Sequence, residues 1–226
     1  MCNDYGNRIP YRDYAEAFSQ LKIPLVFPKP DVAPNLEPRD EIWPTETAPV
    51  IRPAAGGVEL VQLPWGLAPR YPKARGVINM RSEGRSFARG RCLVPASHYY
   101  EFTGTKSPKT RWRFTRAGGD WFCFAGLLGR GKDGEAFTLL TADAGPDVAP
   151  IHNRHQATPA RIVGQAWVSS NAYLERWITP AFWLPRAVRS SRRWSIAQHS
   201  QETCLPAVAL GDPQGAGKAS HHGLAP

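Results

Sequence analysis

Residues 91–104, RCLVPASHYYEFTG, carry the strand signal on which our prediction of the fold depends. Apolar, aromatic and β-branched side chains crowd this stretch, and residues of these types favour extended structure. Two stretches of the same character follow at residues 110–129, TRWRFTRAGGDWFCFAGLLG, and at residues 135–145, EAFTLLTADAG. Gly, Asp and Lys residues separate them, as turn residues do. The three stretches predict a series of short, mainly antiparallel strands.

The residues upstream add one helix and a further strand to this prediction. Residues 11–21, YRDYAEAFSQL, place apolar side chains at helical spacing, which predicts an amphipathic helix. Residues 57–64, GVELVQLP, alternate as a strand does, and Pro64 ends the pattern. Between them, the proline-rich residues 24–53 predict a long loop, in which the six prolines from Pro24 to Pro44 exclude regular structure of any length, because proline lacks a backbone N–H donor. Loops of such length are usually functional.

These elements belong to the α+β class, as a single β-rich domain with few helices that we expect to cover residues 1–200. After about residue 153 the composition shifts toward Arg, Ser, Trp and Pro, and a short helix is expected near Tyr173 to Trp177. Residues 205–226 are rich in Gly, Ala, Pro, Ser and His, so we expect a disordered tail there. A shift of the reading frame would produce such an abrupt change, and we hold that explanation as a hypothesis.

The charge of the chain is compatible with a nucleic-acid partner. The chain has 226 residues and a formal net charge of +9, with a pI of about 9.7. The excess is rich in arginine, with Trp and Tyr residues between, and this mixture suits phosphate contacts and base stacking on single strands. A merely basic surface explains the charge equally well, so charge alone leaves nucleic-acid binding open.

Neither a membrane segment nor a metal site is indicated. No apolar run approaches the roughly eighteen residues that a membrane span needs, and the N-terminus lacks the layout of a secretory signal. We therefore expect a cytoplasmic, DNA-associated protein. The four cysteines, Cys2, Cys92, Cys123 and Cys204, include no C-x-x-C pair, which argues against a zinc site and against a dense disulfide framework. We expect no metal and no cofactor, and we expect Cys92 and Cys123 to be buried packing residues.

Cys2 is the first candidate for chemistry. Methionine aminopeptidases remove Met1 when the next side chain is small, and the chain would then begin with a residue that carries both an α-amine and a thiol. Unperturbed groups of these kinds have pKa values of about 8 and about 8.5, so each has a usable nucleophilic fraction at neutral pH. A cysteine without a function is the plainer alternative, and Cys2 alone does not decide between them.

Four further segments accompany Cys2 in a fixed order. They are PWGLAPRY with Trp65, VINMRSEG with Asn79, Arg81 and Glu83, RCLVPASHYYEF with Glu101, and IHNR with His152 and Arg154. Together with MCN at the start, they resemble the SOS-response-associated peptidase (SRAP) family. Its members begin M-C-G-R and carry W-G-x-x-P, N-x-R-x-E, R-C-L-x-P-x-x-x-F/Y-E-W/F and a late H-x-R. The resemblance covers about residues 1 to 155, and the combination is more specific than any one motif.

The resemblance implies a protein of the DNA damage response that binds single-stranded DNA at abasic sites, in a cleft of its domain. In such proteins the N-terminal cysteine traps the ring-opened deoxyribose as a thiazolidine, which is a covalent DNA–protein crosslink. Lyase activity at the abasic site and autoproteolytic removal of Met1 are further activities open to such a protein. The resemblance also implies a monomer, with no membrane partner.

The resemblance assigns catalytic roles to three more residues. Glu101 would move protons during imine formation, and its aromatic neighbours would remove it from water. His152 would stand near the sugar and its 3′ phosphate, and Asn79 would hydrogen-bond near the cysteine or the opened sugar. Each also has a plainer explanation, as a solvated carboxylate at a strand end, an ordinary polar histidine and a turn residue.

The resemblance also implies a set of DNA contacts. Arg81 and Arg154 match the family's phosphate-contacting arginines, whose planar guanidinium can bind two phosphate oxygens. Trp65 would stack beside the lesion as a wedge, although a core tryptophan is the commoner outcome for such a residue. The wall beside the lesion would be formed by Pro44 and Thr45, and Arg85 is a weaker candidate for the same groove.

Two departures and two alternatives accompany this interpretation. Asn3 and Asp4 stand where the family usually has Gly and Arg, and a carboxylate so close to Cys2 would disfavour DNA phosphate locally. A hydrolase or amidotransferase that uses an N-terminal cysteine is one alternative, but the contexts of Trp65 and Glu101 do not serve that chemistry. A non-catalytic single-strand binder is the other, and it would use the arginines without Cys2.

Overall fold

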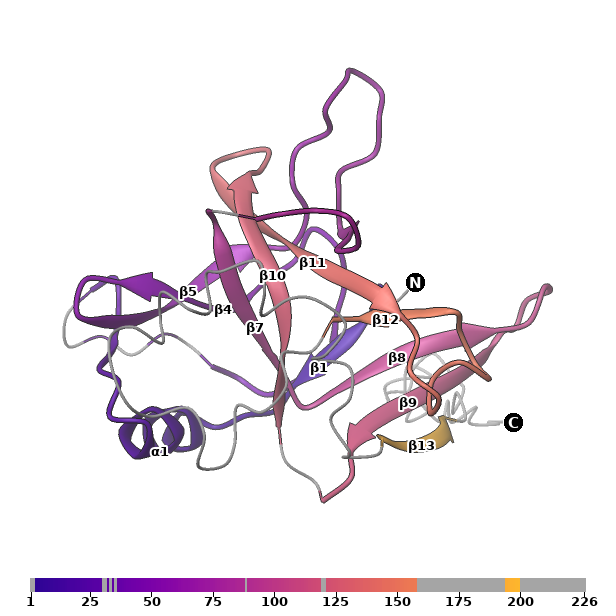
Figure 1. Ribbon diagram of the computed structural model, residues 1–226, viewed down its shortest axis with the longest axis horizontal. Helices are drawn as coiled ribbons and strands as arrows, with labels where there is room; N and C mark the ends of the chain where they lie inside the picture. The colour runs from indigo at the N-terminus through magenta and orange to yellow at the C-terminus, as the bar shows by residue number, and fades with distance from the viewer. Residues whose placement is uncertain are drawn as a thin grey trace, which may run out of the picture.

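The structure is a computed structural model, and it describes residues 3–29, 32, 34, 36–87, 89–118, 121–157 and 194–199. Two β-sheets make up most of this part of the chain, and helix α1 (Tyr11–Gln20) lies beside one of them (Figure 1). Among the pairs of strands described, those of β2 with β5 and of β6 with β11 are parallel and the others are antiparallel. The expected α+β class, with a β-rich and mainly antiparallel domain, is confirmed.

One sheet has five strands in the order β13-β9-β8-β1-β3. Its strands are β1 (Tyr5–Asn7), β3 (Arg39–Ile42), β8 (His98–Thr103), β9 (Thr110–Arg116) and β13 (Trp194–His199). β1 pairs with β8 on one side and with β3 on the other, with Tyr5 opposite both Tyr99 and Ile42. The beginning of the chain is therefore held against the strand that carries Glu101.

The other sheet has eight strands, seven of them in the order β12-β11-β10-β7-β4-β5-β2 and with β6 paired to β11. Its strands are β2 (Leu25–Val26), β4 (Thr47–Ala54), β5 (Gly57–Pro64), β6 (Asn79–Arg81), β7 (Arg91–Ala96), β10 (Phe122–Arg130), β11 (Glu135–Asp143) and β12 (Arg154–Gln156). The strands predicted within residues 91–104, 110–129 and 135–145 are present. The first of these stretches divides at Ser97 into β7 and β8, which belong to different sheets.

Aromatic side chains fill the core between the two sheets. Tyr99 stacks on Phe114 with ring centroids 4.6 Å apart and meets Phe124 edge to face at 5.8 Å. Tyr5 meets Phe124 in the same way at 5.6 Å. Each such pair contributes about 0.5–1.5 kcal/mol beyond the burial of its area. The expected burial of Cys92 and Cys123 is confirmed, and both thiols are free.

Helix α1 confirms the amphipathic pattern of residues 11–21. Its buried residues, Tyr14 and Phe18, pack in a second apolar cluster with Ile51 and Leu60 of the eight-stranded sheet. The Tyr14 hydroxyl also accepts a hydrogen bond from the Asn7 side-chain amide at 2.9 Å. The helix therefore connects Asn7, the last residue of β1, to the apolar cluster on the eight-stranded sheet.

The proline-rich segment contains more structure than we predicted. We expected a long loop over residues 24–53, yet β4 runs from Thr47 to Ala54 and pairs with β5 along its whole length. Pro53 and Pro49 lie opposite Val58 and Gln62. Counted from the two-residue turn that joins β4 to β5, both are non-hydrogen-bonded positions of an antiparallel ladder. The missing N–H groups of the prolines therefore cost the β4–β5 ladder nothing.

Two short strands near the C-terminal side were not predicted. β12 pairs with the end of β11, and β13 pairs with β9 over six residues from Trp194 to His199. The Trp194 ring meets Tyr99 at 5.3 Å and Phe122 at 5.0 Å, so β13 joins the main core. The helix expected near Tyr173 to Trp177 and the tail expected over residues 205–226 lie outside the described residues. None of the described helices has the length and apolar character needed to span a membrane.

Candidate functional site

The predicted site residues of the eight-stranded sheet gather around the C-terminal end of β11. β6 runs parallel to β11, with Asn79 opposite Leu139 and Arg81 opposite Thr141. On the same stretch, Arg154 of β12 lies opposite Asp143, and His152 precedes β12 by two residues. Backbone pairing, and not chance proximity of loops, therefore brings Asn79, Arg81, His152 and Arg154 to one end of the sheet.

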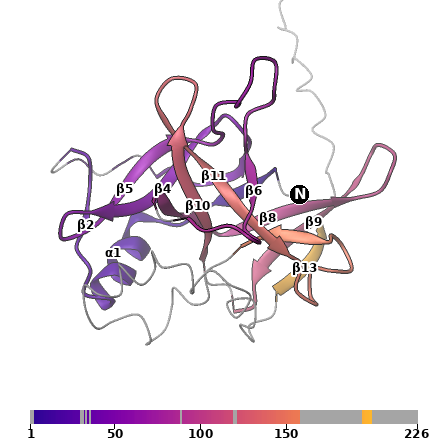
Figure 2. The ribbon, with the colours of Figure 1, turned by 45° about the horizontal axis from the view of Figure 1, so that its top comes forward.

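The remaining catalytic candidates belong to the five-stranded sheet. The C-terminal end of β11 lies beside β8, which carries Glu101, in both views of the ribbon (Figures 1 and 2). The Tyr100 N–H donates to the Asp4 carbonyl at 3.0 Å, so the residue next to Glu101 binds the segment that leads into β1. Cys2 itself lies outside the described residues, and its role stays a prediction.

Glu101 is a buried carboxyl group. Its side chain lies on the same face of β8 as Tyr99, opposite Trp112 of β9, and the residue is 1% exposed. The expected removal of Glu101 from water is therefore confirmed, and the alternative of a solvated carboxylate is wrong. A carboxyl group is one of the side chains that act as general acids and bases, and here it is shielded from bulk water.

His152 is half-buried beside the start of β12. Its Nδ1 lies 3.0 Å from the backbone N–H of Arg154, from which a neutral ring accepts a hydrogen bond. Burial, followed by nearby positive charge that includes Arg154, lowers the pKa of His152 below its ordinary value. The ring is therefore neutral at neutral pH and can take up a proton as a base.

Arg154 is a buried ion-pair residue. Its guanidinium donates to Glu83 at 2.8 Å, to Asp143 at 3.0 Å and to the Thr141 carbonyl at 2.9 Å. Although burial opposes it, the hydrogen bond from Arg154 holds the pKa of Glu83 below its ordinary value. In this structure the guanidinium donors of Arg154 are engaged by protein groups of β11 and of the segment after β6, and its phosphate-binding role stays a prediction.

Trp65 is a core residue and not an exposed wedge. It is completely buried, stacks parallel to Phe137 at 6.4 Å and meets Tyr5 edge to face at 5.3 Å. Its Nε1–H donates to the Ile78 carbonyl at 2.8 Å. Because no face of the ring is exposed, the stacking role that we expected of Trp65 is wrong, and the plainer reading as a core tryptophan is right.

Pro44 and Thr45 form a turn that the backbone of Trp65 supports. The Thr45 N–H donates to the Trp65 carbonyl at 2.7 Å, and the Trp65 N–H donates to the Glu46 carbonyl at 2.9 Å. Thr45 is exposed and has a φ of 78°, a left-handed conformation that non-glycine residues rarely adopt. Trp43, next to this turn, is 38% exposed. The role of this turn as a wall beside DNA stays a prediction.

Tyr71, an aromatic residue that is 68% exposed, was not among the predicted site residues. It lies on the connection between β5 and β6, which projects beyond the sheets in Figure 1 and also exposes Arg70, Lys73 and Arg75. The Ala68 N–H donates to the Arg130 carbonyl at 2.8 Å and fixes the base of this connection. The signal in the sequence was the RYPK tetrapeptide, in which an aromatic ring sits among cations and beside a proline.

Arg81 and Arg85 remain available as cationic contacts. Both side chains are exposed, Arg81 at the end of β6 and Arg85 in the segment after it. The Ser82 N–H donates to the Thr141 carbonyl at 2.9 Å, which fixes the backbone between them. Exposure is what a phosphate contact requires, and the phosphate-binding role of both residues stays a prediction.

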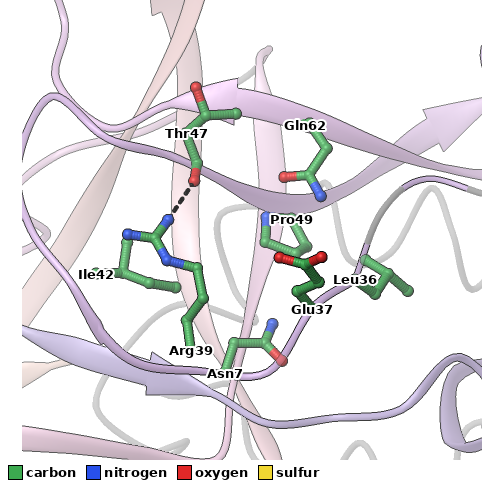
Figure 3. Close-up of a pocket in the computed structure, with 8 residues that line it drawn as sticks. All are labelled: Asn7, Leu36, Glu37, Arg39, Ile42, Thr47, Pro49 and Gln62. Carbon is green, nitrogen blue, oxygen red and sulfur yellow. Dashed lines mark hydrogen bonds between the residues drawn. The ribbon is translucent and has the colours of Figure 1, made fainter.

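A pocket with a volume of about 270 Å³ opens among β1, β3, β4 and β5 (Figure 3). Arg39, which lines it, donates to the Thr47 carbonyl at 3.0 Å and pairs with Glu46 at 2.7 Å. The Asn7 amide, which also lines it, is occupied by Tyr14 and by the Pro95 carbonyl. None of the predicted site residues lines this pocket.

Within the described ranges, no group of three or more His, Cys, Asp or Glu side chains could hold a metal ion.

The described residues define a β-rich protein in which a buried carboxyl group on β8 lies near the end of the eight-stranded sheet that carries a half-buried histidine and exposed arginines (Figures 1 and 2). The chain belongs to the SOS-response-associated peptidase (SRAP) family, because the sequence model of that family matches residues 1–182. Membership associates the protein with the response to DNA damage and with DNA.

Solved structures share this fold. A phage-related protein from Bordetella bronchiseptica has a TM-score of 0.61 at 19% identity, with 88% of this chain and 95% of that chain covered. A second protein from Bordetella bronchiseptica has a TM-score of 0.59 at 22% identity, with 88% and 100% covered. A protein from Bacteroides thetaiotaomicron has a TM-score of 0.50 at 18% identity, with 72% and 78% covered. At these identities the likeness shows the fold alone. No curated protein matches the chain.

Proposed function

We propose that the protein binds single-stranded DNA at abasic sites and traps the ring-opened deoxyribose on Cys2. The observation that carries the proposal is the placement of Glu101, a carboxyl group that is 1% exposed on the strand paired with the beginning of the chain. Membership of the SRAP family supports the link to damaged DNA.

The proposed reaction joins the aminothiol of Cys2 to the aldehyde carbon of the opened sugar. The α-amine adds to this carbon and gives a carbinolamine, which loses water to form an imine. The thiol sulfur then adds to the imine carbon, and the nitrogen takes up the thiol proton. The sum is one aldehyde and one aminothiol converted to a thiazolidine and one water. Met1 must first be removed, since only a free α-amine can begin this sequence.

Each candidate residue has a role in this scheme. Glu101 would accept the proton that the amine loses and return it to the departing hydroxyl group. His152, as a neutral ring, would act as a second base near the sugar. Asn79 would donate to and accept from the opened sugar without changing its charge. Arg154 would act indirectly, because its contacts with Glu83 and Asp143 hold β6 and β12 in register.

The DNA path would follow the exposed cations and aromatic rings. Arg81 and Arg85 would contact phosphates, and the turn that contains Pro44 and Thr45 would line the path. Tyr71 replaces Trp65 as the stacking residue in this proposal, because its ring is exposed. Arg70, Lys73 and Arg75 surround Tyr71 in the sequence, and their charges would attract the flanking phosphates.

The test is a denaturing gel after incubation with single-stranded DNA that carries one abasic site. Intact mass measurement first confirms the loss of Met1. The protein should give a shifted band that survives denaturation, and Cys204→Ala should give it too. Cys2→Ser keeps the amine but cannot form the thiazolidine, so its band should require borohydride reduction of the imine. No band from a folded protein without Met1 would refute the crosslinking function.

The same experiment separates the two alternatives. A non-catalytic binder would shift the DNA in a native gel and leave no covalent band. An amidotransferase or hydrolase would release ammonia or a carboxylic acid from an amide substrate, with no dependence on an abasic site. Cleavage of the DNA strand at the lesion would add a lyase activity to the trap.

A further inference from the structure

Trp43 is an aromatic residue that is 38% exposed and that the reaction proposed above does not use. It follows the last residue of β3, Ile42, which lies opposite Tyr5 of the antiparallel strand β1. Trp43 and Asp4, the residue before Tyr5, therefore lie at the same end of these two strands. Cys2 stands two residues before Asp4 in the sequence. An exposed indole ring is thus found at the end of β3 that adjoins the beginning of the chain.

The turn after Trp43 is connected to the strand that carries Asn79. The Thr45 N–H donates to the Trp65 carbonyl at 2.7 Å, and the Trp65 indole donates to the Ile78 carbonyl at 2.8 Å. Ile78 directly precedes Asn79, the first residue of β6. One core residue therefore holds both the turn after β3 and the start of β6, so Trp43 lies beside elements that carry predicted site residues.

Hydrogen bonds hold Trp43 in place. Its backbone N–H donates to the Glu46 carboxylate at 2.6 Å, and its Nε1–H donates to the Glu41 carboxylate at 3.4 Å. Arg39 pairs with the same Glu46 at 2.7 Å and donates to the Thr47 carbonyl at 3.0 Å. A tryptophan side chain has only two rotatable bonds, and a ring that is already held loses little further freedom when a ligand stacks on it.

The charges around Trp43 suit an uncharged ligand. The three carboxylates of residues 40–46 are each paired with an arginine. The pairs are Asp40 with Arg8, Glu41 with Arg111 at 2.6 Å, and Glu46 with Arg39 at 2.7 Å. Arg111 also pairs with the buried Asp4, so these pairs leave no surplus of positive charge to attract a phosphate. A nucleobase is uncharged and has a π-face, which an exposed indole ring can bind.

We infer that Trp43 is a stacking residue for the unpaired base next to the abasic site. The inference rests on the proposed function, in which the beginning of the chain reaches the opened sugar. A base next to that sugar has lost its stacking neighbour on one side, and an aromatic ring can take the place of that neighbour. Tyr71 differs, because the cations that surround it in the sequence would hold phosphates as well. Trp43 binds its base by stacking alone.

The first test measures the affinity for single-stranded DNA by fluorescence anisotropy. The oligonucleotide carries a tetrahydrofuran spacer in place of the abasic sugar, because a spacer has no aldehyde and binding stays reversible. Trp43→Ala should raise the dissociation constant about 5-fold to 150-fold, which corresponds to the loss of one stacked base. Tyr11→Ala removes another exposed aromatic residue, on α1, and should bind as the wild type does.

Two further variants separate stacking from apolar contact and from stability. Trp43→Phe keeps an aromatic ring and should recover most of the affinity. Trp43→Leu keeps an apolar side chain without a π-face, so it should bind as weakly as Trp43→Ala. It also gives the same comparison if Trp43→Ala unfolds. Tight binding by Trp43→Leu would show that stacking is not the contact, and would overturn the inference.

A second set of oligonucleotides identifies the base. Each replaces one base beside the spacer with a further spacer. In the wild type, one of these replacements should lower the affinity by about the same factor as Trp43→Ala does. In Trp43→Ala the same replacement should have no further effect, because the stacked pair is already lost.

The outcomes distinguish this inference from the proposed function. If Trp43→Ala binds as tightly as the wild type, or if every replacement has the same effect in both proteins, the inference is overturned. A wild type that still forms the crosslink on a true abasic site would then leave the proposed function intact. A folded wild type without Met1 that forms no crosslink overturns the proposed function and the inference with it.

Discussion

Trp65 and Tyr71 should respond to truncation in opposite ways. Trp65→Ala is expected to destabilise the fold, whereas Tyr71→Ala is expected to leave stability unchanged and to weaken DNA binding. The two residues lie in the same segment, within six residues of each other. Each is therefore the natural control for the other.

The magnitude for Trp65 follows from its burial. A fully buried tryptophan removes about 200 Å² from water, which at about 25 cal/mol per Å² corresponds to about 5 kcal/mol. An extended unfolded chain makes this an upper bound, and such truncations usually cost about 3–5 kcal/mol. The variant also loses the hydrogen bond from the indole to the Ile78 carbonyl, which keeps only the Leu139 N–H as a donor. We expect a loss of about 4 kcal/mol, a large part of the stability of an ordinary domain.

The magnitude for Tyr71 follows from its exposure of 68%. A surface substitution of this kind changes the free energy of unfolding by about 0.5 kcal/mol or less. Loss of one stacked base costs about 1–3 kcal/mol of binding, which raises the dissociation constant about 5-fold to 150-fold.

Urea denaturation and fluorescence anisotropy with labelled single-stranded DNA measure the two effects. Trp65→Phe is the milder companion of Trp65→Ala, because it keeps most of the apolar area and loses the hydrogen bond, for a cost of about 1–2 kcal/mol. Our assignment would be refuted if Trp65→Phe kept full stability but bound DNA weakly, or if Tyr71→Ala bound DNA as tightly as the wild type.

Four further predictions concern the charged residues. Glu101→Gln should lower the crosslinking rate by about 100-fold without changing DNA affinity, because general acid–base catalysis contributes on that scale; single-turnover kinetics measure it. Arg81→Ala should weaken binding to all sequences alike and reduce the slope of affinity against salt by about one, measured by anisotropy at several salt concentrations. Arg154→Met should destabilise the fold by about 2 kcal/mol in urea, because Glu83, Asp143 and Thr141 lose the charged hydrogen-bond donor that they share; an unchanged midpoint would contradict this. The free energy of unfolding should fall between pH 4 and pH 7 in the wild type relative to Asp4→Asn. The folded Asp4 keeps its proton up to a pKa of about 7, whereas the unfolded residue loses its proton near 3.8; equal pH profiles for the two proteins would show that this is wrong.

The strands and the burial of Glu101 could be predicted because their signals are local. Residues 91–145 carry aromatic and apolar runs broken by turn residues, and such patterns predict strands without knowledge of the rest of the fold. Glu101 stands between Tyr100 and Phe102, and a strand so rich in aromatic residues belongs to a core. The strand β4 was missed because the tolerance for its prolines depends on the register with β5, and register is a property of two segments.

The orientation of single side chains could not be predicted in the same way. Trp65 and Tyr71 are both aromatic residues near prolines, and only the packing of Phe137 and Tyr5 on the Trp65 ring decides which is buried. Arg154 fits an H-x-R motif whether it faces DNA or the interior. Its direction depends on Asp143 of β11 and on Glu83 in the segment after β6, which meet it through strand pairings that no local pattern reveals.

Asp4 and Glu101 act on opposite faces of the same pair of strands, and this separates their effects. Successive side chains of a strand alternate, so Glu101 shares the core face of β8 with Tyr99, while Tyr100 and its partner Arg111 lie on the other face with Asp4. Asp4 therefore cannot take the place of Glu101 as the proton carrier. If Glu101 supplies the chemistry and Asp4 only holds β9 against the first strand through Arg111, Asp4→Asn should change the rate by the same factor whether residue 101 is Glu or Gln. A change that disappears in the Glu101→Gln background would instead place both carboxyl groups in one proton path.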